Sequence, residues 1–137
     1  MTYTREQILN MPEGRGLDAL AADVVMGFEL YDGLPAYPKY YIPGYEKIYF
    51  KDVPCYSTDI AAATELEART LEKKSAKYIS ELIDVIYKPE IGIVQFDSYT
   101  GEETLTYEGV AHLMKATPEQ RTKAAILAMM ESGGTGK

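Results

Sequence analysis

The chain has 137 residues, of which 46% are hydrophobic and 26% are charged, with 14 Lys and Arg against 21 Asp and Glu. This length fits one domain whose hydrophobic core needs neither a metal nor a disulfide, and the apolar content excludes a disordered chain. The formal net charge of −7 repels phosphate backbones, so we expect no binding to long nucleic acids.

The first residues contain no apolar signal run, and no stretch approaches the roughly 18 apolar residues of a membrane span. The single cysteine, Cys55, cannot form an internal disulfide, which fits a reducing compartment. We therefore expect a cytoplasmic protein that does not enter a membrane.

Residues 4–28 are expected to form a helical N-terminal segment. Thr4 and Gln7 match a capping box for a short first helix, which the Pro12-Glu13-Gly14 stretch ends. A second helix follows, in which apolar residues recur at intervals of three and four: Leu17, Leu20, Ala21, Val24, Val25 and Phe28.

Residues 32–56 are expected to form a long Tyr/Pro-rich loop. They hold four of the seven prolines and six of the twelve tyrosines. Connections of this length inside a domain are functional or disordered, and the tyrosines argue against disorder. Within the loop, residues 47–51 alternate in the manner of a short edge strand.

The second half of the chain is expected to hold one helix and three strands. Any of Ser57, Thr58 and Asp59 can cap a half-buried helix over residues 58–78, and the acidic Asp59 also suits the positive end of the helix dipole. Alternating or apolar stretches then predict strands at three places: residues 79–87, 91–97 and 103–112. The Gly-containing connection between the last two indicates a hairpin, and hence antiparallel pairing.

Thr117, Pro118 and Gln120 give the clearest local signal, because Thr caps, Pro suits the first helical position and Gln closes a capping box. They begin a helix over residues 118–131, followed by a flexible tail at 132–137. Residues 1–137 are therefore interpreted as one α+β domain, in which a three-stranded or slightly larger antiparallel sheet packs with helices.

Several segments resemble the phage ABA sandwich domain family, a group of small bacteriophage and prophage proteins. The similar segments are residues 5–15, 18–20, 25–27, 56–63 (YSTDIAAA), 117–119 and 123–128. The chain departs from the family pattern at Thr64, where Trp is usual, and at Gln120-Arg121, where Ala-Ile is usual. The resemblance implies a sandwich-like domain encoded by a phage or prophage, and it brings no catalytic residues.

Catalysis is not expected from the residue types present. His112 and Cys55 are far apart in sequence and lack metal-ligand spacing, so we predict no metal site and no cofactor. Asp97, Glu102 and Glu103 belong to a hairpin that should be solvated, which does not favour acid–base chemistry. An enzyme would need these three carboxylates to converge with His112.

The Tyr/Pro-rich loop is the one feature that suggests a binding site. Tyrosine stacks on nucleobases or anchors protein interfaces, and the loop's lysines make it basic within an acidic protein. Two arginines outside the loop are added as phosphate partners. The candidate ligand-binding residues are Tyr40, Tyr41, Tyr45, Tyr49, Lys39, Lys47, Arg15 and Arg69. The other interpretation is that the rings pack the loop onto the domain.

Two functional hypotheses follow. In the first, a small phage-encoded accessory protein acts in the host cytoplasm by binding rather than catalysis, sequestering a small nucleotide-like signalling molecule to counter host defence. In the second, the chain is a protein–protein interaction module, either a homo-oligomer or a binder of a host protein, using strand 47–51 and the half-covered sheet as edges.

Overall fold

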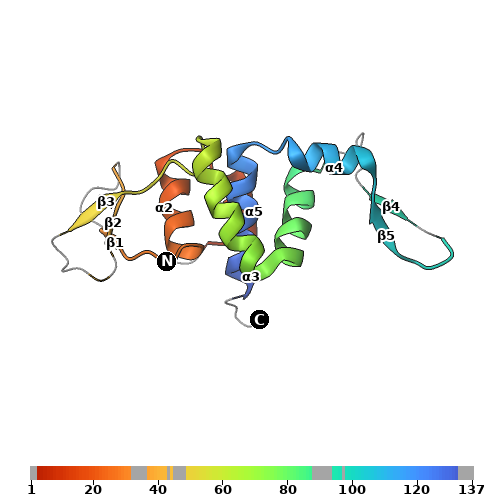
Figure 1. Ribbon diagram of the computed structural model, residues 1–137, viewed down its shortest axis with the longest axis horizontal. Helices are drawn as coiled ribbons and strands as arrows, with labels where there is room; N and C mark the ends of the chain where they lie inside the picture. The colour runs from red at the N-terminus through yellow and green to blue at the C-terminus, as the bar shows by residue number, and fades with distance from the viewer. Residues whose placement is uncertain are drawn as a thin grey trace.

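A helical body carries a small antiparallel sheet at each of its two ends (Figure 1). The computed structural model describes residues 3–31, 37–42, 44, 49–87, 94–96 and 98–132. In chain order the elements are α1 (Arg5–Asn10), α2 (Arg15–Val24), β1 (Leu30–Tyr31), β2 (Lys39–Tyr41), β3 (Phe50–Asp52), α3 (Ile60–Ile86), β4 (Val94–Phe96), β5 (Glu103–Leu105), α4 (Tyr107–Met114) and α5 (Pro118–Ser132). The α+β class expected from the sequence is confirmed.

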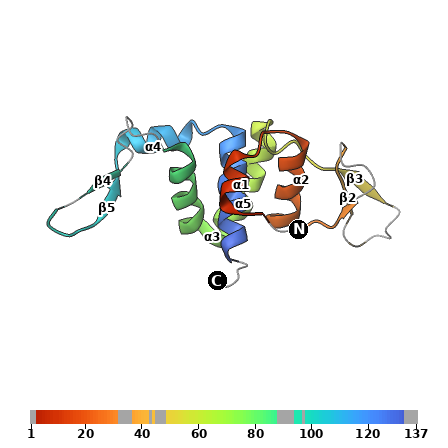
Figure 2. The same cartoon turned by 180° about the vertical axis from the view of Figure 1, so that it is seen from behind.

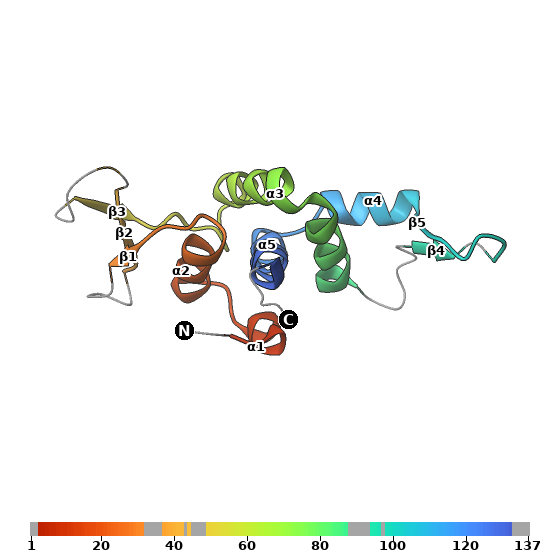
Figure 3. The same ribbon diagram turned by 90° about the horizontal axis from the view of Figure 1, so that it is seen from below.

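Helix α5 is the centre of the body. Seen end-on, α5 is surrounded by α1, α2 and the two halves of α3 (Figure 3). The view from behind shows α1 in front of α5 (Figure 2). Ala124, Ala125, Ile126, Leu127 and Ala128 are all fully buried. A helix that is apolar around its whole circumference must be covered on every side, which explains its central place.

The expected helix 118–131 and the N-terminal helical segment are confirmed, together with their caps. Thr117 and Gln120 exchange hydrogen bonds of 2.9 and 3.1 Å between backbone and side chain. Thr4 and Gln7 form the same capping box at α1. The flexible tail was expected at residues 132–137, but Ser132 still belongs to α5, and residues 133–137 lie outside the described residues.

The prediction of a strand at residues 79–87 is wrong, because α3 continues through these residues to Ile86. Tyr78, Leu82 and Ile86 are buried and lie four residues apart, so they form one face of a helix. The β-branched residues between them produced a strand-like alternation as well. No Pro or Gly interrupts residues 60–87, so the helix can continue. Packing against α5 then favours the helix over a strand.

The prediction of a strand at residues 103–112 is also wrong, except for its first three residues, which form β5. Thr106 accepts a hydrogen bond of 2.9 Å from the Gly109 backbone N–H and so begins α4. The antiparallel pairing of the last two strands is confirmed, since β4 and β5 pair with Val94 opposite Leu105. Residues 91–93 and 97 of the expected second strand lie outside the described residues.

Strands β2 and β3 of the three-stranded sheet lie in residues 32–56, which were expected to be a loop, and β1 directly precedes them. The order of the sheet is β1-β2-β3, and both pairings are antiparallel. Each strand has two or three residues, which is too short for a periodic pattern to be visible in the sequence. The expected edge strand 47–51 overlaps β3, while residues 45–48 lie outside the described residues.

Helix α3 bends at Lys74, whose φ of −145° and ψ of 56° are not helical. The bend lets residues 60–73 follow one side of α5 and residues 75–86 follow another (Figure 3). Glu67 and Tyr78 lie on either side of the bend, and the Tyr78 hydroxyl donates a hydrogen bond of 2.5 Å to the Glu67 carboxylate.

Arg121 of α5 completes this contact. Its Nη1 donates to both Glu67 oxygens at 2.8 Å, and the exposed fractions of the two side chains are only 13% and 17%. The same guanidinium donates to the carbonyls of Met114 and Ala116 at 3.0 and 2.9 Å. One ion pair therefore joins both halves of α3, α5 and the end of α4; we call Glu67, Tyr78 and Arg121 the clasp.

We expect Glu67→Gln to lower the free energy of unfolding by about 2 kcal/mol, because it leaves the Arg121 charge nearly buried without its anion. Urea denaturation followed by circular dichroism measures this loss. Glu72→Gln, at an exposed position of α3, is the matched control and should change stability by less than about 0.5 kcal/mol. Equal stabilities of the two variants would contradict the role of the clasp.

Candidate functional site

The register of the three-stranded sheet divides its side chains between two faces, because successive residues of a strand alternate. Leu30, Tyr40 and Lys51 are paired across the strands and share one face. The opposite face, which we call the outer sheet face, carries Tyr31, Lys39, Tyr41, Phe50 and Asp52.

The first of these faces attaches the sheet to the body. Leu30 and Tyr40 are partly buried against the core, and the Tyr40 ring stacks on Phe28 with 4.1 Å between ring centroids and 9° between planes. Tyr40 was expected to bind a ligand, and the structure shows its ring in packing contacts.

The outer sheet face carries an aromatic cluster. Tyr31 and Phe50 stack in parallel with their centroids 5.1 Å apart, and Tyr41 meets them edge-on at 6.0 and 6.3 Å. The Phe50 side chain is nevertheless 41% exposed. These contacts hold rigid, partly exposed rings on a sheet surface, an arrangement that suits recognition of another apolar surface.

Lys39 and Asp52 form an ion pair on the same face. The Lys39 ammonium holds the pKa of the Asp52 carboxyl below its usual value, and it also lies 5.8 Å from the centre of the Phe50 ring. The positive charge that was expected to meet a phosphate thus has an internal partner.

Arg15 also has internal partners. Its guanidinium donates to Asp18 at 2.8 Å, to the Val53 carbonyl at 2.5 Å and to the Cys55 sulfur at 3.1 Å. Asp18 is 1% exposed and accepts two further hydrogen bonds of 2.7 Å, from the backbone N–H and the hydroxyl of Ser57. Arg15 therefore ties α2 to the segment that leads into α3.

The remaining candidates do not gather into one site. Arg69 is exposed on α3, and Tyr49, 53% exposed, precedes β3. Tyr45 and Lys47 lie outside the described residues. Lys39 and Tyr41 are the candidates that share the outer sheet face, and sequence reasoning missed its other members, Tyr31, Phe50 and Asp52. Strand alternation is the signal that would have found them, but only β3 was expected as a strand, in part, within residues 47–51.

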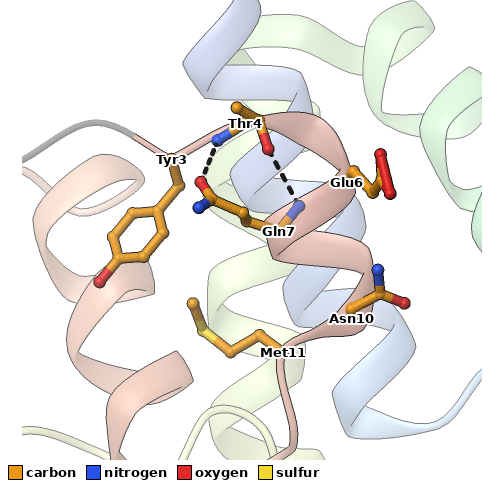
Figure 4. A pocket seen from close by; sticks show the side chains of 6 residues that line it. All are labelled: Tyr3, Thr4, Glu6, Gln7, Asn10 and Met11. Atoms are coloured by element: carbon orange, nitrogen blue, oxygen red, sulfur yellow. Dashed lines mark hydrogen bonds between the residues drawn. The ribbon is translucent and has the colours of Figure 1, made fainter.

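A hollow of about 550 Å³ lies along α1 and is lined by Tyr3, Thr4, Glu6, Gln7, Asn10 and Met11 (Figure 4). Thr4 and Gln7 bond to each other there, as the dashed lines of Figure 4 show. The polar groups of these two residues serve the helix cap, so the hollow offers no convergent set for a ligand.

The residues that an enzyme would need are placed as follows. His112 is partly buried on α4 rather than at a strand end, and Glu102 is exposed. Asp97 lies outside the described residues. No three His, Cys, Asp or Glu side chains among the described residues are grouped so that they could hold a metal ion. Within the same part of the chain, no helix has the length and apolar character required to cross a bilayer.

Comparisons with protein-family models, with curated proteins and with solved structures find no match to this chain.

Tyr56 belongs to the hydrophobic core and is 1% exposed, and its burial raises the pKa of its hydroxyl to about 12. The unfolded chain loses this proton near pH 10, whereas the folded chain keeps it. Stability supplied by Tyr56 is therefore fully present below pH 10 and is lost as the pH rises towards 12. Burial and the bond to Glu67 raise the pKa of Tyr78 in the same direction.

We expect Tyr56→Phe to reduce the alkaline loss of stability by up to about 2 kcal/mol, because phenylalanine has no proton to lose. Denaturant unfolding at several pH values between 9 and 12 measures the slope, with tyrosinate absorbance as a second readout. Tyr37→Phe, at a ring that is 70% exposed, is the control and should leave the slope unchanged. Identical slopes for the two variants would refute the assignment.

Proposed function

We propose that this protein acts by binding a protein partner rather than by catalysis, with the outer sheet face as the binding surface. The observation that carries the proposal is the stacked and partly exposed aromatic cluster of Tyr31, Tyr41 and Phe50 on a small sheet at one end of the molecule. Aromatic side chains held in place before binding lose little freedom on association, and they dominate the energy of many protein interfaces.

The edge of β3 adds a second means of binding. The Ile42 N–H donates to the Tyr49 carbonyl at 3.1 Å, and the Val53 N–H donates to the Pro38 carbonyl at 3.0 Å. In an antiparallel ladder these bonds alternate, so the backbone groups of Phe50 and Asp52 point away from β2. All three β3 residues are exposed, and within the described residues β3 is the last strand of its sheet.

An extended segment of the partner would therefore pair with β3 through backbone hydrogen bonds and place apolar side chains on the outer sheet face. The resemblance to phage ABA sandwich proteins supports a narrower form of the proposal. In that form the protein is phage-encoded, acts in the host cytoplasm and binds a host protein.

The contacts favour this proposal over sequestration of a nucleotide-like signal. A phosphate at Lys39 or Arg15 would have to displace Asp52 or the buried Asp18, and both ion pairs are already formed. The inward packing of Tyr40 also removes one of the rings offered for stacking. Nucleotide binding stays a prediction from the sequence, and it is tested separately below.

Affinity capture from a bacterial lysate, followed by titration of the purified partner, tests the protein-binding proposal. Phe50→Ala should weaken the partner at least tenfold, because it removes the exposed ring at the centre of the cluster. Asp52→Pro should do the same by removing an edge N–H, whereas Asp52→Ala keeps that N–H and should bind within about threefold of the unchanged protein.

The melting temperature of each variant is measured first, to check that it folds. The proposal is wrong if no protein is captured above a bead control. It is equally wrong if Phe50→Ala and Asp52→Pro both bind the purified partner as the unchanged protein does.

We expect no rise in melting temperature with a panel of cyclic and linear adenine and guanine nucleotides, because Lys39 and Arg15 already have anionic partners. A bound ligand at one hundred times its dissociation constant would add about 2.7 kcal/mol of stability, which a melting curve resolves readily. A rise that Tyr41→Ala abolishes and Tyr99→Ala preserves would instead support the nucleotide hypothesis.

A further inference from the structure

Helix α4 presents an apolar stripe to solvent. Tyr107, Val110, Ala111 and Met114 follow the spacing of one helical face, and all four are exposed. The exposed fractions of Tyr107 and Met114 reach 97% and 75%. An amphipathic helix in a monomer normally turns such a stripe inward, so this orientation marks a surface that a partner covers.

The opposite side of α4 holds the helix against the body. Gly109 is buried, and Leu113 packs against the core. The Met114 carbonyl accepts a hydrogen bond from Arg121 of the clasp at 3.0 Å. The stripe is therefore fixed in its outward orientation by contacts at both its middle and its end.

Charges beside the stripe indicate what covers it. Glu108 and Lys115 are both exposed and lie seven residues apart, so they occupy the same flank of the helix. If a second α4 lies antiparallel across a two-fold axis near Ala111, Glu108 of each copy faces Lys115 of the other. A parallel two-fold pair would place the charged flanks of the two copies on opposite sides of the interface, so Glu108 and Lys115 would find no partner in each other there.

The shapes are also self-complementary in this arrangement. It brings Met114 of one copy opposite Tyr107 of the other, beside a hollow of about 500 Å³ lined by Leu105, Thr106, Tyr107 and Glu108. A methionine side chain is flexible enough to fill an irregular hollow, and its sulfur makes favourable contacts with aromatic rings.

We propose that this chain forms a two-fold symmetric dimer in which the α4 stripes of two copies pack antiparallel, flanked by two Glu108–Lys115 ion pairs. The interface is isologous, because the same patch is used by both copies. Eight residues span only about 12 Å, so the contact is at the small end of specific interfaces and the dimer dissociates at micromolar concentration. The outer sheet face of the previous proposal lies at another place in the molecule and stays accessible (Figure 1).

Sedimentation velocity over a concentration series from low micromolar to millimolar tests the dimer. The unchanged chain should shift from monomer to dimer across the series. Met114→Glu should weaken association at least tenfold by placing a charge in the stripe, and Tyr107→Ser provides a second variant of the same kind.

A charge exchange tests the antiparallel arrangement. Glu108→Lys alone and Lys115→Glu alone should each weaken the dimer several-fold, because each makes two like-charged contacts. The double variant Glu108→Lys/Lys115→Glu should return to within about twofold of the unchanged chain. Glu72→Lys, at an exposed position of α3, controls for the change in net charge.

Several results would overturn the proposal. One is an unchanged chain that stays monomeric throughout the series, and another is a dimer that Met114→Glu and Tyr107→Ser leave intact. The proposal also fails if the single charge variants associate as the unchanged chain does, or if the double variant does not regain association. Asp52→Pro should dimerise normally, so failure of the dimer and failure of the outer sheet face as a binding surface give different results.

Discussion

The arrangement of this molecule depends on one nearly buried ion pair, Arg121 with Glu67. Its geometry satisfies most of the donors of the guanidinium, and Tyr78 donates a third hydrogen bond to the carboxylate from beyond the bend of α3. A charge placed between helices at this depth is costly unless it is neutralised, so the three elements that carry its partners are held together. The clasp thereby connects the two halves of α3, on either side of the bend at Lys74, with α5 and with the end of α4.

The middle of α5 has no polar side and must be covered completely. Four helical segments from residues 5–86 cover it: α1, α2 and the two halves of α3. The two sheets project from the ends of this helical core (Figure 1), and their strands are two or three residues long. A projecting sheet has exposed edges and faces, which a monomer would normally avoid. The aromatic outer sheet face and the outward stripe of α4 are thus consequences of the same division between a closed helical core and its projecting ends.

The helix caps are features that a short stretch of sequence predicts without knowledge of the fold. Thr117, Pro118 and Gln120 predict the start of α5 correctly, because a cap depends only on residues within one turn. Residues 79–87 were misread because their apolar residues satisfy both a two-residue and a four-residue repeat. Of the candidate site, Lys39 and Tyr41 were identified from composition, while Phe50 was missed because its importance comes from stacking on Tyr31, which is distant in sequence.

By itself, the sequence determined the α+β class, the capped helices at the two ends and the concentration of aromatic residues between residues 31 and 56. These properties depend on composition and on neighbours within one or two turns, so no tertiary contact is needed to recognise them. The tertiary structure alone decided that residues 79–86 are helical, that Tyr40 faces inward while Tyr41 faces outward, and that α4 turns its apolar side to solvent. Each of these depends on which surface is buried by residues far away in the chain, and burial against α5 outweighs a local preference of a few tenths of a kcal/mol per residue.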